Sequence, residues 1–372
     1  MSPVQAHILD GYAAESIALG AGIIRAGELL GLPTETVYGL AADAENDAAI
    51  AKIFAAKGRP SDHPLIVHVL DETGVAHFAS DVPAFAQQLI KAFWPGPLTL
   101  ILPRRAGVAA AAAGGQNSIG LRSPSHPVAQ ALLTACLQPD VNLPSSTVNA
   151  SKQVWGIAAP SANQFGRVSP TTAAHVQGEF GADLTILDGG PCDVGIESTI
   201  IDCTRGVPVL LRPGAITPEQ VQAVCGLKVL SKDELLTQAA PAPRASGTLE
   251  SHYAPNAKVR LMDAKALQTA LDLIGDGLDS AVAPAANATS AAAPTHGGGP
   301  TIATYARAIL KTRSAKVLRR RMPDDAAATA QQLFAVLREF DAQGVKLIWI
   351  ETPPDEAEWD GVRDRLVRAS AG

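Results

Sequence analysis

Hydrophobic residues in the first 225 positions follow two spacings, one helical and one strand-like. In 44–57, Ile50, Ile53 and Phe54 recur at three- and four-residue intervals, and Gly58 ends the pattern, which predicts a helix. A helix is also expected within 13–30, and another begins at "TPEQ" (217–220), a capping-box sequence. Short apolar runs typical of strands lie at 64–70, 97–103, 118–122, 156–160, 185–190, 198–202 and 207–214. Because strands crowd 97–214 and helices stand at both ends, we predict a mixed α/β domain whose sheet need not be parallel.

The periodic pattern weakens and then resumes. Residues 226–256 are rich in Pro, Ala and Ser, which indicates a linker. Low-complexity sequence at 283–300 predicts a disordered loop. Strands are expected at 258–263 and 345–351, and helices at 264–274, 324–343 and 355–369, as in a small βαβ-type, Rossmann-like domain. The predicted organisation is a first domain over 1–225, a linker over 226–256 and a second domain over 257–372.

Composition and charge restrict the class of protein. The 372 residues are 47% apolar, enough for two cores, and carry a net charge of −6. The sequence contains neither an apolar run near the roughly 18 residues of a membrane span nor a signal-peptide pattern at its N-terminus. Four cysteines are scattered without a C-x-x-C. We therefore expect a cytoplasmic protein with reduced thiols and no membrane contact, and the acidic charge disfavours a broad nucleic-acid footprint.

The common nucleotide-binding and hydrolase motifs are missing from the sequence. It has no G-x-x-x-x-G-K-[ST], no G-x-G-x-x-G between a strand and a helix, no G-x-S-x-G and no H-E-x-x-H. If phosphates bind, separate cationic and hydroxyl side chains must hold them.

Lys57 and Arg59 are the leading cationic candidates, because an ammonium group and a guanidinium fork suit a triphosphate. We expect both to be at least partly exposed at a helix end, where two ordinary dipole-complementing charges are the alternative interpretation. His63 lies in the following turn, where a solvated histidine is the simplest interpretation. His68 interrupts an apolar strand, either as a core histidine or as a contact to a small polar substrate.

Hydroxyl and cationic side chains also stand at the ends of several predicted strands. In "PTET", Thr34 and Thr36 share one face if the segment is extended, with Glu35 on the other. Ser118 and Arg122 share a face of their strand. The other polar candidates at strand ends are Ser161, Asn163, Ser198 and Arg212.

Six segments together carry a family resemblance. They are "LPTETVYGL" (32–40), "AAKGRPSDHPLIVH" (55–68), "SIGLR" (118–122), "APSAN" (159–163), "GIESTIID" (195–202) and "LLRPG" (210–214). In this order they make the chain resemble the YrdC/Sua5 family of threonylcarbamoyl-adenylate synthases, in the long form whose second domain is entered through "SHYAP" (251–255). The resemblance implies a YrdC-like mixed twisted sheet with a concave cleft, followed by a smaller Rossmann-like α/β domain.

The same resemblance implies an activity and its residues. The family joins L-threonine, bicarbonate or CO2 and ATP into L-threonylcarbamoyl-AMP with release of pyrophosphate, the first step of threonylcarbamoyladenosine (t6A) modification of tRNA. Mg2+ is expected with ATP, without a protein metal site, and the expected partners are the downstream threonylcarbamoyl-transferase machinery and, weakly, tRNA. The implied catalytic residues are Lys57, Arg59, Ser161 and Asn163. The residues implied to contact ATP are these four with His63, Ser118, Ser169, Arg212 and Tyr253. Those implied to contact threonine are Thr34 or Thr36, His68, Arg122 and Ser198.

Two other interpretations stand beside this one. The first is a non-catalytic YrdC-like module that binds double-stranded RNA or tRNA, against which the acidic charge and the complete K-x-R and S-x-N argue. The second is a carbamoyl-transferase accessory domain, which would carry acylphosphatase and zinc-finger segments that this sequence lacks.

The chain departs from the family at three places. Residues 138–155 look like an insertion, His63 stands where many relatives have Asn, and the linker lacks their basic residues. The "SHYAP" segment nevertheless predicts that 241–256 covers the cleft as a lid, with His252 or Tyr253 near the nucleotide.

Overall fold

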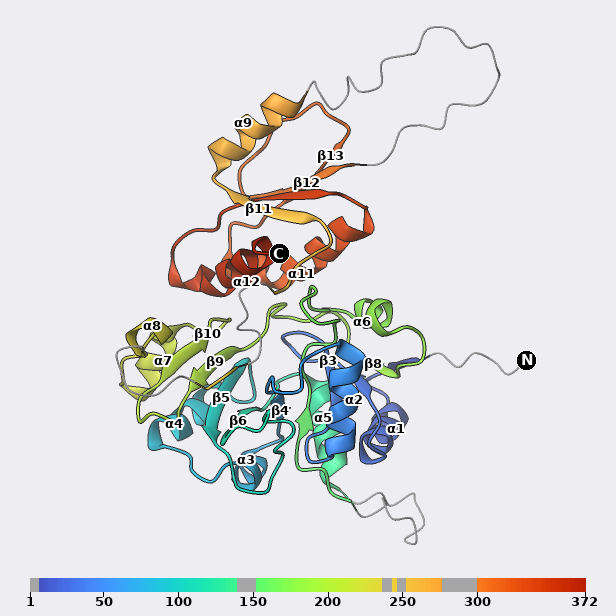
Figure 1. Ribbon diagram of the computed structural model, residues 1–372, viewed down its shortest axis with the longest axis vertical. Helices are drawn as coiled ribbons and strands as arrows, with labels where there is room; N and C mark the ends of the chain where they lie inside the picture. Colours follow the sequence, from blue (N-terminus) through green and yellow to red (C-terminus); the bar gives the residue numbers. More distant parts are fainter. Residues whose placement is uncertain (1–6, 139–151, 236–242, 246–251, 276–299) are drawn as a thin grey trace, which may run out of the picture. The chain divides into compact units, whose positions relative to one another are not determined.

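The structure, a computed structural model, describes residues 7–138, 152–235, 243–245, 252–275 and 300–372 (Figure 1). The chain divides into two compact units, Met1–Leu249 and Glu250–Gly372. The first contains a large mixed sheet and the second a separate parallel sheet. The predicted mixed α/β architecture with a smaller Rossmann-like unit is therefore confirmed.

The large sheet of the first unit has the strand order β1-β8-β2-β3-β7-β4-β6-β5-β9-β10. Its strands are β1 (Ile8–Asp10), β2 (Leu30–Leu32), β3 (Gly39–Asp43), β4 (Ile66–His68), β5 (Leu98–Pro103), β6 (Ser118–Arg122), β7 (Ile157–Ala158), β8 (Ile186–Asp188), β9 (Thr199–Asp202) and β10 (Val209–Arg212). Its helices are α1 (Ala14–Arg25), α2 (Asp47–Lys57), α3 (Glu72–Phe78), α4 (Ala84–Phe93), α5 (Pro127–Leu137), α6 (Ala173–Phe180), α7 (Pro218–Cys225) and α8 (Lys232–Leu235). Figure 1 shows α1, α2 and α5 together at one end of this unit and α4, α7 and α8 at the other.

Strands distant in sequence lie side by side at the centre of this sheet. β4 pairs in parallel with β6, with His68 opposite Arg122. β6 pairs antiparallel with β5, and β5 pairs in parallel with β9, where Leu98 is opposite Thr199. This order brings β4, β6 and β9, and thus three of the polar segments found in the sequence, to one region of the sheet, with β5 between β6 and β9.

Local capping signals define two helices as predicted. The side chain of Asn46 accepts a hydrogen bond from the Ala49 amide at the start of α2, and Gly58 ends the helix with a φ of 61°. At the start of α7, the Thr217 hydroxyl and the Gln220 side chain form both bonds of a capping box.

The second unit contains a four-stranded parallel sheet in the order β11-β14-β12-β13. Its elements are β11 (Lys258–Met262), α9 (Ala264–Gly275), β12 (Ile302–Ala306), β13 (Val317–Arg321), α11 (Ala326–Ala342), β14 (Leu347–Glu351), the 3-10 turn η1 (Ala357–Trp359) and α12 (Asp360–Ser370). In Figure 1, α9 covers one face of this sheet and α11 and α12 cover the other. The sequence pattern predicted β11, β14 and the three helices, but not β12 and β13.

The boundary between the units differs from the predicted linker. Leu230 pairs with β10 through the bond from the Leu210 amide to its carbonyl (2.9 Å), so residues 226–235 pack on the first unit. His252 and Tyr253 are buried in the second unit. The segment joining the units is thus shorter at both ends than 226–256. The proposed insertion at 138–155 and loop at 283–300 fall largely outside the described residues.

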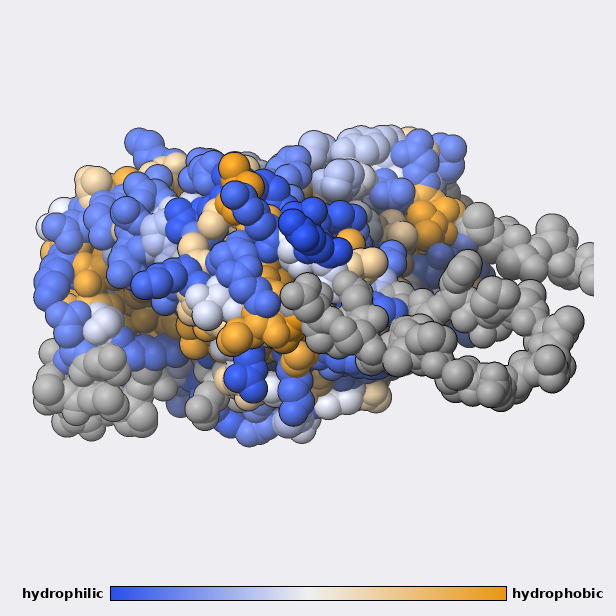
Figure 2. Space-filling model, turned by 90° about the horizontal axis from the view of Figure 1, so that it is seen from above, coloured by the Kyte–Doolittle hydropathy of each residue, from blue (hydrophilic) through white to orange (hydrophobic). Residues whose placement is uncertain are grey.

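The surface carries scattered hydrophobic side chains. Figure 2 shows polar residues over most of one face, with apolar residues in smaller groups among them. The large apolar side chains exposed by more than half are Tyr12, Leu19, Leu273, Ile309 and Val367. They come from different elements, as is usual for single exposed apolar residues.

Candidate active site

The end of α2 joins the K-x-R and S-x-N segments. The Lys57 ammonium donates to the carbonyl of Ser161 (Nζ to O, 2.5 Å) and to that of Asn163. The Lys57 carbonyl in turn accepts from the Phe165 amide (2.9 Å). Gly58 turns the chain, and Arg59 Nη2 donates to the Pro64 carbonyl (2.9 Å). Lys57 thus joins two segments of the chain, since Ser161 and Asn163 lie 104 and 106 positions after it in the sequence.

Both cations are buried, which contradicts the expected exposure. Lys57 is 2% exposed and Arg59 is 8% exposed. The loop that follows β7 is bonded to the end of α2 through the carbonyls that Lys57 reaches, and this contact between distant segments is invisible to helical periodicity. Burial, and secondarily the charge of Arg59, lowers the pKa of Lys57 to about 7.

The "PTET" segment forms a tight turn rather than an extended strand. The Thr34 hydroxyl accepts from the Thr36 and Val37 amides (both 3.3 Å) and donates to the Val37 carbonyl (2.6 Å). The Thr36 hydroxyl lies 2.9 Å from the Thr34 hydroxyl and also accepts from Arg122 Nη1 (2.8 Å). Thr34 therefore closes the turn, while Thr36 faces the guanidinium.

Arg122 lies between this turn and two strands. Its Nη2 is 2.6 Å from Glu35 Oε1, and its Nε donates to the Gly96 carbonyl (3.2 Å). His68 stands opposite Arg122 in the parallel register of β4 and β6. Burial, and secondarily the charge of Arg122, lowers the pKa of His68 to about 3, so the imidazole is neutral at physiological pH.

Ser198 and Arg212 form a second polar group at the start of β9. Ser198 Oγ is 2.7 Å from Thr99 Oγ1, and Arg212 donates to the Ser198 carbonyl through Nε (3.0 Å) and to its hydroxyl through Nη2 (3.2 Å). Gly214 lies so close to this backbone that a Cβ there would be 2.5 Å from the Thr199 nitrogen, which explains the glycine after Arg212-Pro.

The remaining candidates have separate surroundings. Ser169 donates to Glu197, whose charge acts on Lys57. The His63 ring packs edge-on to Phe165, with centroids 5.7 Å apart. Ser118 lines a small hollow with Arg244. Tyr253 is placed in the second unit, where its ring packs on Phe334 (5.4 Å) and beneath Arg365 (5.4 Å).

Sequence reasoning missed three polar contacts made by residues inside the quoted motifs. Thr99 bonds Ser198, and Glu197 bonds Ser169. Glu35 was expected on the face opposite the two threonines, and this was wrong, because the turn directs its carboxylate to Arg122. The signal available for Glu35 was its position within "PTET", because a carboxylate between two candidate ligand residues can bind a nearby cationic side chain.

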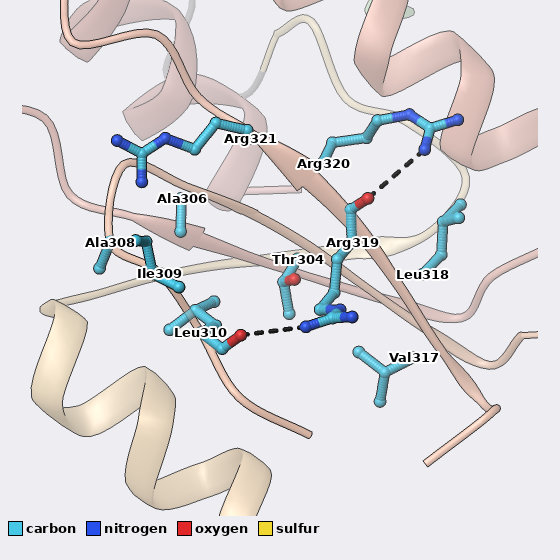
Figure 3. Close-up of a pocket in the computed structure, with 10 residues that line it drawn as sticks. All are labelled: Thr304, Ala306, Ala308, Ile309, Leu310, Val317, Leu318, Arg319, Arg320 and Arg321. Atoms are coloured by element: carbon cyan, nitrogen blue, oxygen red, sulfur yellow. Dashed lines mark hydrogen bonds between the residues drawn. The ribbon is translucent and has the colours of Figure 1, made fainter. Parts of the chain in front are cut away.

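A different hollow, of about 470 Å3, lies in the second unit over β12 and β13 (Figure 3). Thr304 and Arg319 lie opposite each other in register, and Arg319 Nη1 donates to the Leu310 carbonyl (3.0 Å). Arg320 and Arg321 pair with Glu339 and Asp324. This hollow contains none of the candidate residues predicted from the sequence.

Within the described residues, no helix is long and apolar enough to cross a membrane. The same part of the chain holds no group of three or more His, Cys, Asp or Glu placed to bind a metal ion.

Comparisons with known proteins cover nearly the whole chain. A family model described as "Telomere recombination", for Sua5, YciO and YrdC, matches residues 22–214, and one described as "Threonylcarbamoyl-AMP synthase, C-terminal domain" matches 216–371. The threonylcarbamoyl-AMP synthase of Bacillus subtilis (strain 168) is 35% identical over 358 residues, which span 96% of this chain and 93% of that protein. The one from Pyrococcus abyssi (strain GE5 / Orsay) is 40% identical over 248 residues, or 66% and 68% of the two chains.

The structural comparison agrees with the sequence comparison. The crystal structure of P. abyssi Sua5 complexed with L-threonine matches with a TM-score of 0.76 and 33% identity, covering 95% of this chain and 94% of that one. Both units are thus matched in sequence and in fold. The chain belongs to the Sua5/YrdC family, in its two-domain Sua5 form.

Proposed function

We propose that this protein joins L-threonine, bicarbonate or CO2 and ATP into L-threonylcarbamoyl-AMP and releases pyrophosphate, as the first step of t6A synthesis. The observations that carry the proposal are two buried groups in the first unit: Lys57, bonded to the S-x-N loop and followed by Arg59, and Arg122 with Thr36 and His68. The first group suits phosphates and the second suits a small polar amino acid.

The two groups divide the substrates between them. Lys57, Arg59, Ser161 and Asn163 hold ATP, with Arg212, Ser169, Ser118 and His63 around it. Arg122 holds the carboxylate of threonine, and Thr36, His68 and Ser198 surround the rest of the amino acid. Of the two threonines in the turn, Thr36 is the better ligand candidate, because its hydroxyl contacts Arg122, whereas the Thr34 hydroxyl is bonded to the backbone of the turn.

This chemistry requires no protein nucleophile. The amine of threonine and CO2 form a carbamate, whose oxygen attacks the α-phosphorus of ATP. The protein must bring like-charged reactants together and stabilise negative charge in the transition state, which preorganised cations in a buried site do well. Lys57, Arg59 and Arg212 are buried cations of this kind.

We propose that Mg2+ enters with ATP, held mainly by phosphate oxygens and water. Mg2+ often binds this way at sites that supply one or two carboxylates at most. Glu179 and Glu197 are the described carboxylates whose charges act on Lys57, and they are the candidates for this role. The expected result is that product formation requires a divalent cation.

We also propose a weak tRNA contact at the hollow over β12 and β13. Lys311, Arg313 and Arg319 line it or its neighbouring hollow and have no ion pair within the described part of the chain. Arg313→Glu and Arg319→Glu should weaken tRNA binding and reduce its salt dependence, whereas Arg260→Glu on β11 should not. Equal binding by all variants would contradict this contact. Transfer of the product to the downstream threonylcarbamoyl-transferase machinery completes the proposed route.

The decisive experiment follows pyrophosphate release by the purified full-length chain. We expect release only when threonine, bicarbonate and ATP are all present, with threonylcarbamoyl-AMP identified by mass spectrometry. Arg122→Ala should raise the KM for threonine far more than the KM for ATP. Pyrophosphate release at the same rate with and without threonine would contradict the proposal. RNA binding without any turnover would favour the non-catalytic alternative.

A further inference from the structure

Three buried residues beside the "PTET" turn carry polar atoms without a hydrogen-bond partner among the described residues. They are Glu35, through both carboxylate oxygens, Arg122, through Nη2, and His68, through Nδ1. Glu35 and Arg122 are each only 4% exposed and His68 is 3% exposed. Because buried polar groups in native proteins are almost always hydrogen-bonded, such a cluster indicates a place where a polar ligand completes the bonding.

The geometry of the ion pair specifies the ligand further. Arg122 Nη2 and Glu35 Oε1 are 2.6 Å apart, yet they do not form an aligned hydrogen bond. Thr36 and the Gly96 carbonyl occupy Nη1 and Nε of the guanidinium. The Arg122 guanidinium and the Glu35 carboxylate therefore lie side by side, and each has atoms that can still form hydrogen bonds with a ligand.

We infer that Glu35 binds the α-ammonium group of the amino-acid substrate and accepts one of its protons, while Arg122 holds the carboxylate. This inference rests on the proposed function. An amino acid is a zwitterion whose two charges are separated by a single carbon atom, so it matches an adjacent Arg–Glu pair. An arginine alone would bind any small carboxylate, and Glu35 makes the site selective for one that also carries an amine.

Glu35 also prepares the amine for reaction. An N–H bond of the ammonium breaks, the proton passes to a Glu35 oxygen, and the electron pair stays on nitrogen. That pair forms the N–C bond with CO2, while a C=O π pair moves to oxygen. The second N–H proton then passes to water, which leaves the carbamate anion.

Charged and titratable groups face Glu35 from several elements. Arg122 comes from β6, His126 from the start of α5, and Cys192 from the segment after β8, where Asp193 acts in turn on His126 and Cys192. Burial raises the pKa of the Cys192 thiol, which keeps it neutral. Burial also lowers the pKa of His126, which favours the neutral form of its imidazole. Arg122 is thus the one permanent positive charge among these neighbours.

The test compares L-threonine with 3-hydroxybutanoate, which keeps the carboxylate and hydroxyl but lacks the amine. Calorimetry on the wild-type chain should show threonine binding at least about tenfold more tightly. Glu35→Gln should remove that preference by weakening threonine alone, and Glu35→Asp should retain most of it. Glu45→Gln, a partly exposed carboxylate bonded to His77, is the matched control and should change nothing.

The pH dependence separates a base from a structural support. With Glu35→Gln, kcat/KM for threonine should rise about tenfold per pH unit below the pKa of the amine, because only the free amine reacts. The wild type should show a much flatter profile. Equal weakening of both ligands in Glu35→Gln would mean that Glu35 merely holds Arg122, and equal affinity of the two ligands for the wild type would overturn the inference without any variant. If the wild type prefers threonine but releases no pyrophosphate, the proposed function fails and the binding role of Glu35 stands.

Discussion

Lys57 shows how burial changes the meaning of a charged residue. Its ammonium touches two carbonyls of the S-x-N loop and is 2% exposed, so it is not a surface charge at a helix end. A buried cation that is only partly paired is costly, and it is retained where an anion is to be bound. The Lys57–Arg59 pair at one helix end therefore fits a phosphate site better than a dipole-complementing role.

Removing either cation should abolish most adenylate formation. Lys57→Ala and Arg59→Ala should each lower kcat/KM by about a hundredfold or more, because each removes a buried charge from the phosphate site. Since both side chains also bond to carbonyls, each variant should also lose about 1–3 kcal/mol of stability, measured by thermal unfolding. Lys52→Ala, on the same helix but pairing with Glu28, is the control. Near-wild-type turnover in both variants would show that Lys57 and Arg59 do not bind the phosphates.

ATP binding should be coupled to proton uptake through Lys57. Its pKa of about 7 in the free protein leaves a large neutral fraction at alkaline pH, and nearby phosphate charge would raise that pKa. Binding should therefore take up protons at about pH 8 and hardly any below about pH 6, where Lys57 is already charged. Calorimetry in buffers of different ionisation enthalpy measures the number of protons taken up per ATP bound, and Lys57→Met should reduce this number. If Lys57→Met takes up as many protons as the wild type, a group other than Lys57 binds them.

At the scale of elements, the turn between β2 and β3 separates two similar residues. Thr34 supports the backbone of the turn, and Thr36 supports Arg122. The sequence alone could not distinguish them, because alternation along an extended chain places both on one face.

Thr34→Val and Thr36→Val form a matched pair. Thr36→Val should raise the KM for threonine up to about tenfold, because it removes one hydroxyl from the site, and should cost about 1 kcal/mol of stability, because Arg122 Nη1 loses its acceptor. Thr34→Val should leave that KM nearly unchanged and lower the stability by about 1 kcal/mol or more, because it removes the acceptor of two amides. Steady-state kinetics and thermal unfolding of both variants provide the check. Reversed effects would assign Thr34 to the substrate.

Local signals explain which elements the sequence predicted correctly. α2 and α7 were expected because Gly58 and the "TPEQ" box act within a few residues of a helix end. β13 was missed because "VLRRR" lacks an apolar run, and its place at the sheet edge, beside β12, is a tertiary feature.

The candidate site also has features that the sequence predicts and features that it does not. Its residues were proposed from motifs, because residue types and their spacing can be read directly from the sequence. Their burial was not, because the loop over Lys57 comes from more than 100 positions away. Likewise, the contact of Glu35 with Arg122 depends on a turn geometry that alternation cannot express.

At the scale of the whole molecule, the short segment 243–245, which precedes the second unit in the chain, is attached to the rest of the first unit. The Arg244 amide donates to Gln116 Oε1 (2.9 Å), and Gln116 Nε2 donates to the Arg244 carbonyl (3.2 Å). The Arg244 guanidinium also pairs with Asp62, next to His63. A passive tether would not need three contacts beside the turn that leads from Arg59 to the strand with His68, and Ser118 lines the same hollow as Arg244.

We therefore expect this segment to shield the reaction from water, and truncation tests it. A chain ending at Leu249 keeps the whole first unit with Arg244, whereas one ending at residue 240 loses this segment. The longer chain should retain some pyrophosphate release, and the shorter one should lose more and hydrolyse a larger share of the labile adenylate, because water reaches it. Thermal unfolding of both chains controls for folding, and Arg244→Ala in the full-length chain should move activity in the direction of the shorter truncation. If the two truncated chains turn over ATP and lose adenylate equally, the segment only joins the units, and the shielding must come from elsewhere.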